Sequence, residues 1–115
     1  MPEIGDVVEM IVDKPERNLS VGVQGTIVHS HNKNAYEVEL THKEGETLDV
    51  LALNSEEFVV VWRAETQEWV PIAEQTVAII KHLPDNIAKE VLDFACFLSL
   101  KHRIVNQQMH PQIAG

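Results

Sequence analysis

The sequence predicts an α+β protein in which a small antiparallel β-barrel precedes a C-terminal helical hairpin. Two observations support this fold class. Short β-rich segments alternate with turn residues through the first part of the chain, and the hydrophobic period becomes helical beyond Pro71. We therefore expect a barrel at residues 1–72, the hairpin at residues 73–105 and a flexible tail at residues 106–115.

The predicted barrel contains five or six short strands. The clearest is "AYEVELT", in which Tyr36, Val38 and Leu40 alternate with polar residues, as in a strand with one buried face. The other β-rich segments are residues 7–12, 26–31, 47–53 and 57–62. So many short, curved strands in about 70 residues favour a barrel, which leaves no exposed sheet edge.

Two turns predict how these strands pair. The turn around Gly45 reverses the chain, so we expect the strand that follows it to pair with the Tyr36 strand. A second loop at residues 64–67 places complementary side chains opposite one another. The facing pairs are then Trp62 with Trp69 and Arg63 with Glu68.

Two helices are expected after the strands. Ala73, Val77 and Ile80 recur at helical spacing, and the segment "HLPDN" then interrupts the pattern. Pro84 is followed by an acid and an amide, which suits a helix start because proline fits the first turn and both side chains can cap free N–H groups. The second helix is expected to run from about Pro84 to about Ile104.

The second helix is apolar almost all the way round. In "VLDFACFLSL" only Asp93 and Ser99 interrupt the apolar residues, whereas a surface helix keeps a polar back. Residues 87, 91, 94, 98 and 105 have the spacing of a seam between packed helices. We predict that a partner covers this helix, with Asp93 either facing solvent or pairing with a base on that partner. The predicted partner-binding residues are Ile87, Val91, Asp93, Phe94, Phe97 and Leu98.

The net charge of -9 is concentrated in the predicted barrel. Residues 1–72 hold 14 Asp and Glu against 5 Lys and Arg, whereas residues 73–115 hold 4 of each. An acidic surface repels phosphates, which argues against nucleic acid as a ligand. The same charge favours a basic partner protein, such as a toxin.

Nothing in the sequence indicates a membrane segment or a secretory signal. No apolar run reaches the roughly 18 residues that a membrane span requires, and "MPEIGDVVEM" has acids where a signal peptide has basic and apolar residues. We expect a cytoplasmic protein in which Cys96 is a small buried hydrophobe.

The N-terminal part resembles a known family of small bacterial domains. The residues that carry the likeness are "GDVV" at 5–8, "PE" at 15–16, "GVQGTIV" at 22–28 and "AYEVE" at 35–39. In this order and spacing they resemble domain of unknown function 4926. The resemblance implies an SH3-like barrel and brings no catalytic residues.

Residues 79–102 are similar to a second family, the antitoxin-like helical domain of unknown function 2281. The matching residues are Leu83, Pro84, Glu90, Val91, Leu92, Asp93, Phe94, Phe97 and Leu98. Both resemblances imply a component of a toxin and antitoxin pair or of an immunity pair. The chain lacks the basic N-terminal arm of a DNA-binding antitoxin, which argues against autorepression.

His29 and His31 suggest an alternative function in metal binding. The two share a face on a strand, and with residues 32–34 as the turn, His29 lies opposite Glu37 and His31 opposite Ala35. Two imidazoles and a carboxylate can bind zinc, but structural zinc sites have four ligands. We therefore expect these histidines to be exposed and without a metal.

The sequence thus favours a non-enzymatic protein–protein interaction module that needs no cofactor. No serine is accompanied by a base and an orienting partner, as nucleophilic catalysis requires. One alternative is a self-associating module whose helix forms a homodimeric bundle. The other is a metal-binding protein that uses His29, His31 and Glu37.

Overall fold

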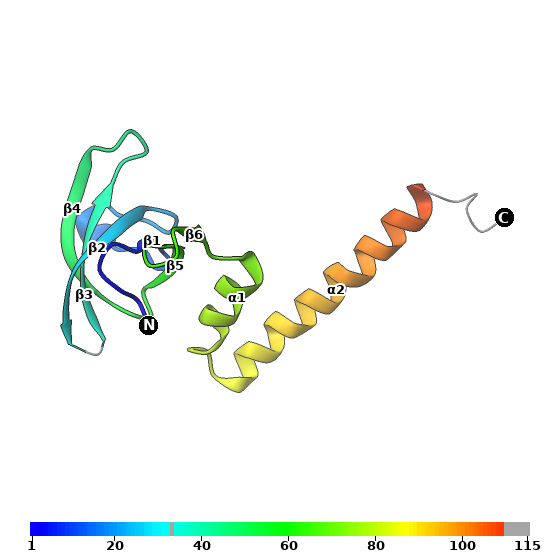
Figure 1. Ribbon diagram of the computed structural model, residues 1–115. Helices are drawn as coiled ribbons and strands as arrows, with labels where there is room; N and C mark the ends of the chain where they lie inside the picture. The colour runs from blue at the N-terminus through cyan, green and yellow to red at the C-terminus, as the bar shows by residue number, and fades with distance from the viewer. Residues whose placement is uncertain (33, 110–115) are drawn as a thin grey trace. The chain divides into compact units, whose positions relative to one another are not determined.

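The structure is a computed structural model that describes residues 1–32 and 34–109, the last three through their backbone (Figure 1). The chain divides into two compact units, Met1–Lys81 and His82–Gly115. Among the described residues, the strands and the first helix belong to the first unit, and the long helix belongs to the second.

The first unit is built on one antiparallel sheet with the strand order β4-β3-β2-β1-β5-β6. Its elements are β1 (Val7–Met10), the 3-10 helix η1 (Pro15–Arg17), β2 (Gln24–Asn32), β3 (Ala35–Thr41), β4 (Thr47–Asn54), β5 (Phe58–Arg63), β6 (Glu68–Trp69) and α1 (Ile72–Ile80). The second unit contains α2 (Asp85–Met109). The predicted α+β class, strands followed by helices, is confirmed.

The core lies against one face of this sheet. Tyr36, Val38 and Leu40 of β3 are buried, as their alternation predicts, and they pack with residues of β1, β2, β4 and β5. Tyr36 meets Phe58 edge to face, with ring centroids 5.6 Å apart, a favourable aromatic geometry. The residues of this cluster are Val8, Met10, Leu19, Ile27, Tyr36, Val38, Leu40, Leu53 and Phe58.

The predicted strand pairings are confirmed. β3 pairs with β4 through the turn that contains Gly45. The last hairpin joins β5 to β6, and its two facing pairs are those expected from the sequence. These pairs are Trp62 with Trp69 and Arg63 with Glu68.

The sheet does not close into a barrel, so the prediction that it has no exposed edge strand was wrong. Among the described residues, β4 pairs with β3 alone and β6 pairs with β5 alone. Closing the sheet requires its two outermost strands to bond to each other, and β6 spans only two residues. Both edges therefore remain.

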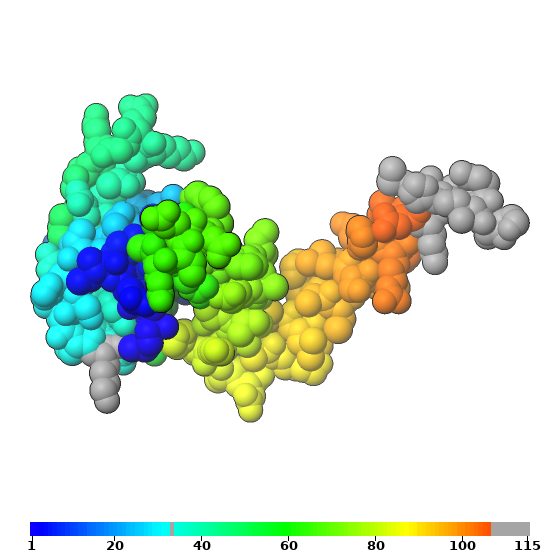
Figure 2. Space-filling model, viewed as in Figure 1, coloured from blue at the N-terminus to red at the C-terminus, as the bar shows by residue number. Residues whose placement is uncertain are grey.

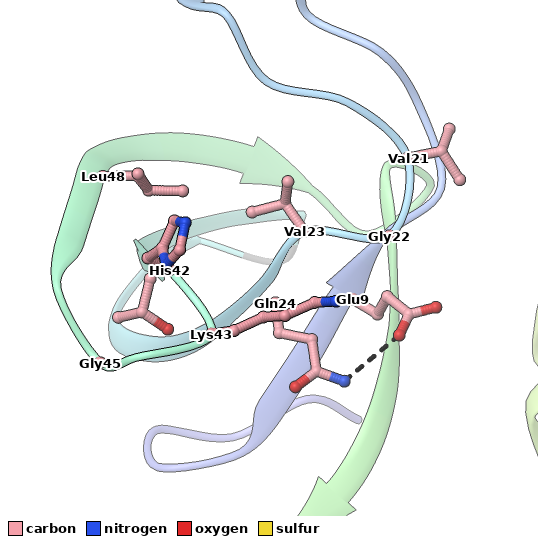
Figure 3. Close-up of a pocket in the computed structure, with 10 residues that line it drawn as sticks. Glu9, Val21, Gly22, Val23, Gln24, His42, Lys43, Gly45 and Leu48 are labelled. Carbon is pink, nitrogen blue, oxygen red and sulfur yellow. Dashed lines mark hydrogen bonds between the residues drawn. The ribbon is translucent and has the colours of Figure 1, made fainter.

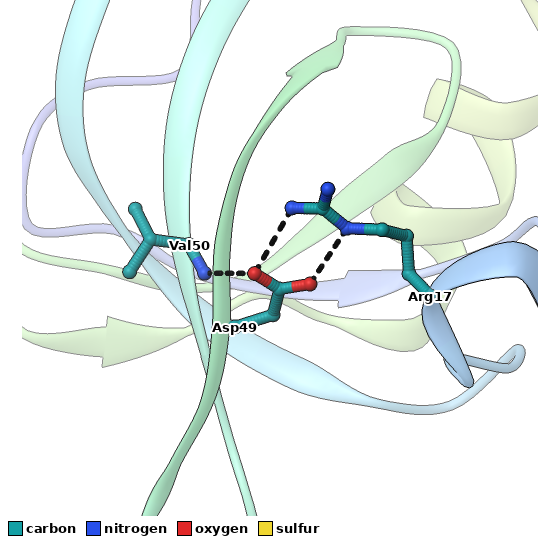
Figure 4. A network of polar contacts seen from close by, with 3 residues as sticks. All are labelled: Arg17, Asp49 and Val50. Carbon is teal, nitrogen blue, oxygen red and sulfur yellow. Dashed lines mark hydrogen bonds and ion pairs between the residues drawn. The ribbon is translucent and has the colours of Figure 1, made fainter.

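An ion pair joins the edge strand β4 to the connection between β1 and β2. Arg17 of η1 donates from Nε to Asp49 Oδ2 at 2.8 Å and from Nη2 to Asp49 Oδ1 at 3.0 Å, and Asp49 Oδ1 also accepts the Val50 N–H (Figure 4). η1 lies in the β1–β2 connection, and β3 separates β4 from β2, so the ion pair joins parts of the sheet that are not neighbouring strands. The Arg17 hydrogen bonds hold the pKa of Asp49 below its ordinary value.

A second ion pair joins the same connection to the start of β5. Lys14 Nζ lies 2.8 Å from Glu57 Oε2, and both side chains are half-buried. Burial raises the pKa of Glu57, but hydrogen bonds from Lys14 and from the Asn54 N–H, together with the Lys14 charge, outweigh it. The pKa of Glu57 is therefore held below its ordinary value.

Replacing Glu57 by glutamine is expected to reduce the acid sensitivity of the fold. With a lowered folded-state pKa, Glu57 stabilises the fold fully above the ordinary glutamate pKa of about 4.3, and this contribution is lost as the pH falls through the lowered pKa. The free energy of unfolding in urea should differ less between about pH 7 and about pH 3 in Glu57→Gln than in the wild type. Glu56→Gln, at the exposed neighbouring residue, should keep the wild-type difference; an unchanged difference in Glu57→Gln contradicts this account.

α1 packs within the first unit. Arg63 Nη2 of β5 lies 2.5 Å from Glu74 Oε2 of α1, and Gln75 Nε2 donates to the carbonyl oxygen of buried Val70 at 2.9 Å. We assigned α1 to a hairpin with the second helix; that pairing stays a prediction.

α2 begins at the predicted position and ends later than predicted. Its first residue, Asp85, follows Pro84, whose carbonyl oxygen accepts the N–H groups of Ile87 and Ala88. The helix continues to Met109, five residues beyond the expected end at Ile104. Residues 106–109 of the predicted tail are thus helical, and residues 110–115 lie outside the described part of the chain.

Candidate partner-binding helix

α2 leaves most of its predicted partner-binding side chains accessible. Phe94 is 61% exposed and Phe97 57%, with ring centroids 6.3 Å apart and nearly parallel planes. Leu98 is 43% exposed and Ile87 38%, whereas Val91 is half-buried. A run of accessible apolar side chains of this size is typical of an interaction surface.

Further apolar residues lie on the other sides of the same helix. Successive residues are rotated by about 100°, so residues 92, 100 and 104 point away from the line through residues 87, 94 and 98. They too contribute to the surface of α2, which is coloured yellow to orange in Figure 2. The exposed residues of this second group are Leu92, Leu100 and Ile104.

Asp93 has a partner that we did not predict from the sequence. Lys89, one helical turn earlier, pairs with the Asp93 carboxylate, and both side chains are more than half exposed. The i, i+4 spacing of an acid and a base is the signal that reveals this pair in the sequence. Because exposed pairs of this kind contribute little stability, Asp93 remains available to a base on a partner.

Cys96 is exposed, contrary to the expectation that it is a small buried hydrophobe. It follows Asp93 and Phe94 on a helix that has accessible side chains all round, so no turn of α2 around it provides a buried face. Its environment depends on what covers α2.

The structure brings together the three residues of the metal alternative. His29 is opposite Glu37, as predicted, but the residue opposite Ala35 is Asn32 and not His31, because β2 is irregular between Ser30 and Asn32. This bulge inserts an extra residue that the sequence does not signal.

These three side chains lie on the accessible surface of β2 and β3. His31 Nε2 is 3.2 Å from Glu37 Oε1, and the rings of His29 and His31 meet edge to face at 4.6 Å. Within residues 1–32 and 34–109, no group of three or more His, Cys, Asp or Glu is arranged to hold a metal ion. The metal-binding alternative therefore gains no geometric support in this part of the chain.

A pocket of about 920 Å³ lies between the start of β2 and the β3–β4 turn (Figure 3). Gln24 Nε2 donates to Glu9 Oε1 at 3.3 Å across one side of it, and His42 Nδ1 accepts the Glu44 N–H at 3.5 Å beside it. The lining residues are Glu9, Val21, Gly22, Val23, Gln24, Thr41, His42, Lys43, Gly45 and Leu48.

The strands of the first unit carry the similarity to known proteins. Residues 4–60 match the family model described as Domain of unknown function (DUF4926). The match supports the N-terminal resemblance, and it does not extend to residues 79–102, whose antitoxin-like resemblance stays a prediction. No curated protein and no solved structure matches the chain.

The motif residues of the DUF4926 segment have structural roles. Asp6 is buried and accepts backbone N–H groups from Glu3 and Ala64. Gly25 is a buried β2 residue in close contact with β3, and Pro15 begins η1. The candidate binding residues lie outside this segment, on α2. None of the described helices is long and apolar enough to cross a membrane.

Proposed function

We propose that the chain is a non-enzymatic protein–protein interaction module, an antitoxin-like or immunity-like component that binds a partner protein through α2. The observation that supports this most strongly is the exposure of Phe94, Phe97 and Leu98 on one helix. We further propose that this binding takes place in the cytoplasm.

The apolar side chains of α2 are the proposed source of affinity. Full burial of a large apolar side chain stabilises by roughly 1.5–3 kcal/mol, and Phe94, Phe97 and Leu98 still expose about half of their area. Covering each of them therefore contributes on the order of 1 kcal/mol. An exposed ion pair contributes about 0–1 kcal/mol, so contact with α2 outweighs any single surface charge.

The first unit supplies charge complementarity to a basic partner. Residues 1–81 hold 15 Asp and Glu against 6 Lys and Arg. Three of these bases, Lys14, Arg17 and Arg63, already pair with acids of the same unit. The remaining acidic surface is expected to speed encounter with a basic partner more than to raise affinity.

Leu98→Ser is expected to weaken complex formation about tenfold, because it removes an apolar side chain from the proposed contact surface. The tagged full-length chain is added to lysate of its native host, and the fraction of chain in complexes is measured by size-exclusion chromatography. Leu48→Ser is a matched control, because Leu48 is 48% exposed against 43% for Leu98 but lies on β4. Equal losses for the two variants, or no complex with the wild type, contradict the proposed function.

A further inference from the structure

The charges of α2 are divided between its two halves. Residues 85–93 contain Asp85, Glu90 and Asp93 against Lys89, a net charge of -2. Residues 94–109 contain Lys101 and Arg103 with no acid, a net charge of +2 when histidine is neutral. The helix therefore carries complementary charge at its two ends, with the exposed phenylalanines between them.

The helix dipole does not account for this division. It favours acids in the first turn and bases in the last turn, and its effect falls off within that turn. Glu90 and Asp93 lie beyond the first turn, and the last turn of α2 contains no base. This separation of acidic and basic residues would suit a second molecule whose charges are complementary to those along α2.

Resting on the proposed function, we propose that the partner of α2 is α2 of a second copy of this chain, packed antiparallel to it. In that orientation each acidic half faces the basic half of the other copy. A parallel pair places acid against acid and base against base, which costs free energy.

The apolar residues along one side of α2, here called the seam, are spaced symmetrically, as an antiparallel pair requires. At about 100° per residue, positions 87, 91, 94, 98, 101 and 105 fall within a sector about 80° wide. These positions are symmetric about residue 96: 94 and 98 are two residues away, 91 and 101 are five, and 87 and 105 are nine. An antiparallel pair centred at this level sets Phe94 beside Leu98 of the partner subunit and Ile87 beside Val105 of the partner subunit.

Lys101 is the one charged residue in this seam. Its aliphatic stem lies level with Val91 of the partner subunit, and its ammonium reaches the side of the seam that carries Glu90. Two such pairs form, one on each side of the two-fold axis. Lys89 and Arg103, which are also level, lie on the side of the helix turned away from the seam.

Charge reversal in the full-length chain tests the contact. Sedimentation of the purified wild type is expected to show a dimer, and Glu90→Lys or Lys101→Glu alone should each raise its dissociation constant about tenfold, since two attractive pairs become repulsive. The double variant Glu90→Lys with Lys101→Glu should restore it to within about threefold. Arg103→Glu is the matched control, because it makes the same charge change on the far side of the helix and should leave the constant nearly unchanged.

Disulfide trapping tests the direction of packing. Ile87→Cys and Val105→Cys are each made in a Cys96→Ser chain, mixed and oxidised. The antiparallel pair predicts a mixed dimer of the two variants, whereas a parallel pair predicts that Ile87→Cys links to itself. The three products differ in mass, and the fluorescence of Trp62 in the first unit reports that each variant is folded.

The outcomes separate this inference from the proposed function. A dimer that responds to the single and double reversals as described, and that forms the mixed disulfide, supports the inference. The inference is overturned if Ile87→Cys links to itself, or if Glu90→Lys leaves the dissociation constant of the dimer unchanged. A monomeric wild type overturns it too; the proposed function stands if that monomer still forms a lysate complex that Leu98→Ser weakens, and falls if it forms none.

Discussion

Asp6→Ala is expected to lower the free energy of unfolding of the first unit by about 2–4 kcal/mol. Asp6 is 4% exposed, and its two carboxylate oxygens accept different backbone donors. Oδ2 accepts the Glu3 N–H at 2.9 Å, and Oδ1 accepts the Ala64 N–H at 3.0 Å. Both hydrogen bonds are partly buried. Alanine leaves both donors without an acceptor, and an unpaired donor that is shielded from water costs about 1–3 kcal/mol.

Asp6 has a large expected effect because its hydrogen bonds connect parts of the first unit that are far apart in the sequence. It joins the residues before β1 to the β5–β6 turn, 58 residues away. The Asp6 carbonyl oxygen also accepts the Ile27 N–H, which fixes the start of β1 against β2. The side chain therefore connects three parts of the sheet.

Two variants make this prediction specific. Asp6→Asn keeps one carbonyl acceptor and should cost less than Asp6→Ala. Asp13→Ala removes another carboxylate that accepts a backbone N–H, that of Val21 at 2.9 Å, but in an exposed place where water replaces it; its cost should stay below about 1 kcal/mol. Urea unfolding followed by tryptophan fluorescence measures all three, and equal costs for Asp6→Ala and Asp13→Ala would refute the assignment.

Gly25→Ala is expected to destabilise the same unit by about 2–3 kcal/mol. Gly25 is buried in β2, opposite Leu40 of β3. A Cβ at this position would lie 2.7 Å from the Glu39 carbonyl oxygen and 2.8 Å from Val38 Cγ1. The nearest of these atoms belongs to the backbone of a paired strand, so the methyl group fits only if β2 and β3 move apart.

Gly45→Ala is the contrasting variant. Gly45 has a φ of +92°, which disfavours any side chain, but no atom lies within 4 Å of the position that a Cβ would occupy. Its cost is therefore backbone strain alone, about 1–2 kcal/mol. Thermal unfolding monitored by circular dichroism is expected to show a lower midpoint for Gly25→Ala than for Gly45→Ala, and the reverse order would contradict the close-contact explanation.

The sequence predicted the local elements well where one pattern acted over a few residues. The alternation around Tyr36 and Val38 predicted the buried face of β3, and the turn residues predicted both hairpins. Pro84 predicted the start of α2. Each of these features depends on backbone preference and on burial of neighbouring side chains, both of which can be read from adjacent residues.

The candidate site was also predictable, because it lies on one continuous helix. The apolar run that includes Phe94 and Phe97 can be recognised from the sequence alone, and the structure shows that these side chains are accessible. The Lys89–Asp93 pair was equally readable from its spacing, although we did not predict it.

By itself, then, the sequence determined the fold class, the strand pairing within hairpins and the apolar character of α2. Only the tertiary structure decided that the sheet stays open and that a bulge places Asn32 opposite Ala35. It alone also showed the ion pair between Arg17 and Asp49 and the hydrogen bond from the Ala64 N–H to Asp6. The physical reason is that these features join residues far apart in the chain or shift register by one residue. Such contacts depend on how strongly the whole sheet curls, which no short stretch of sequence specifies.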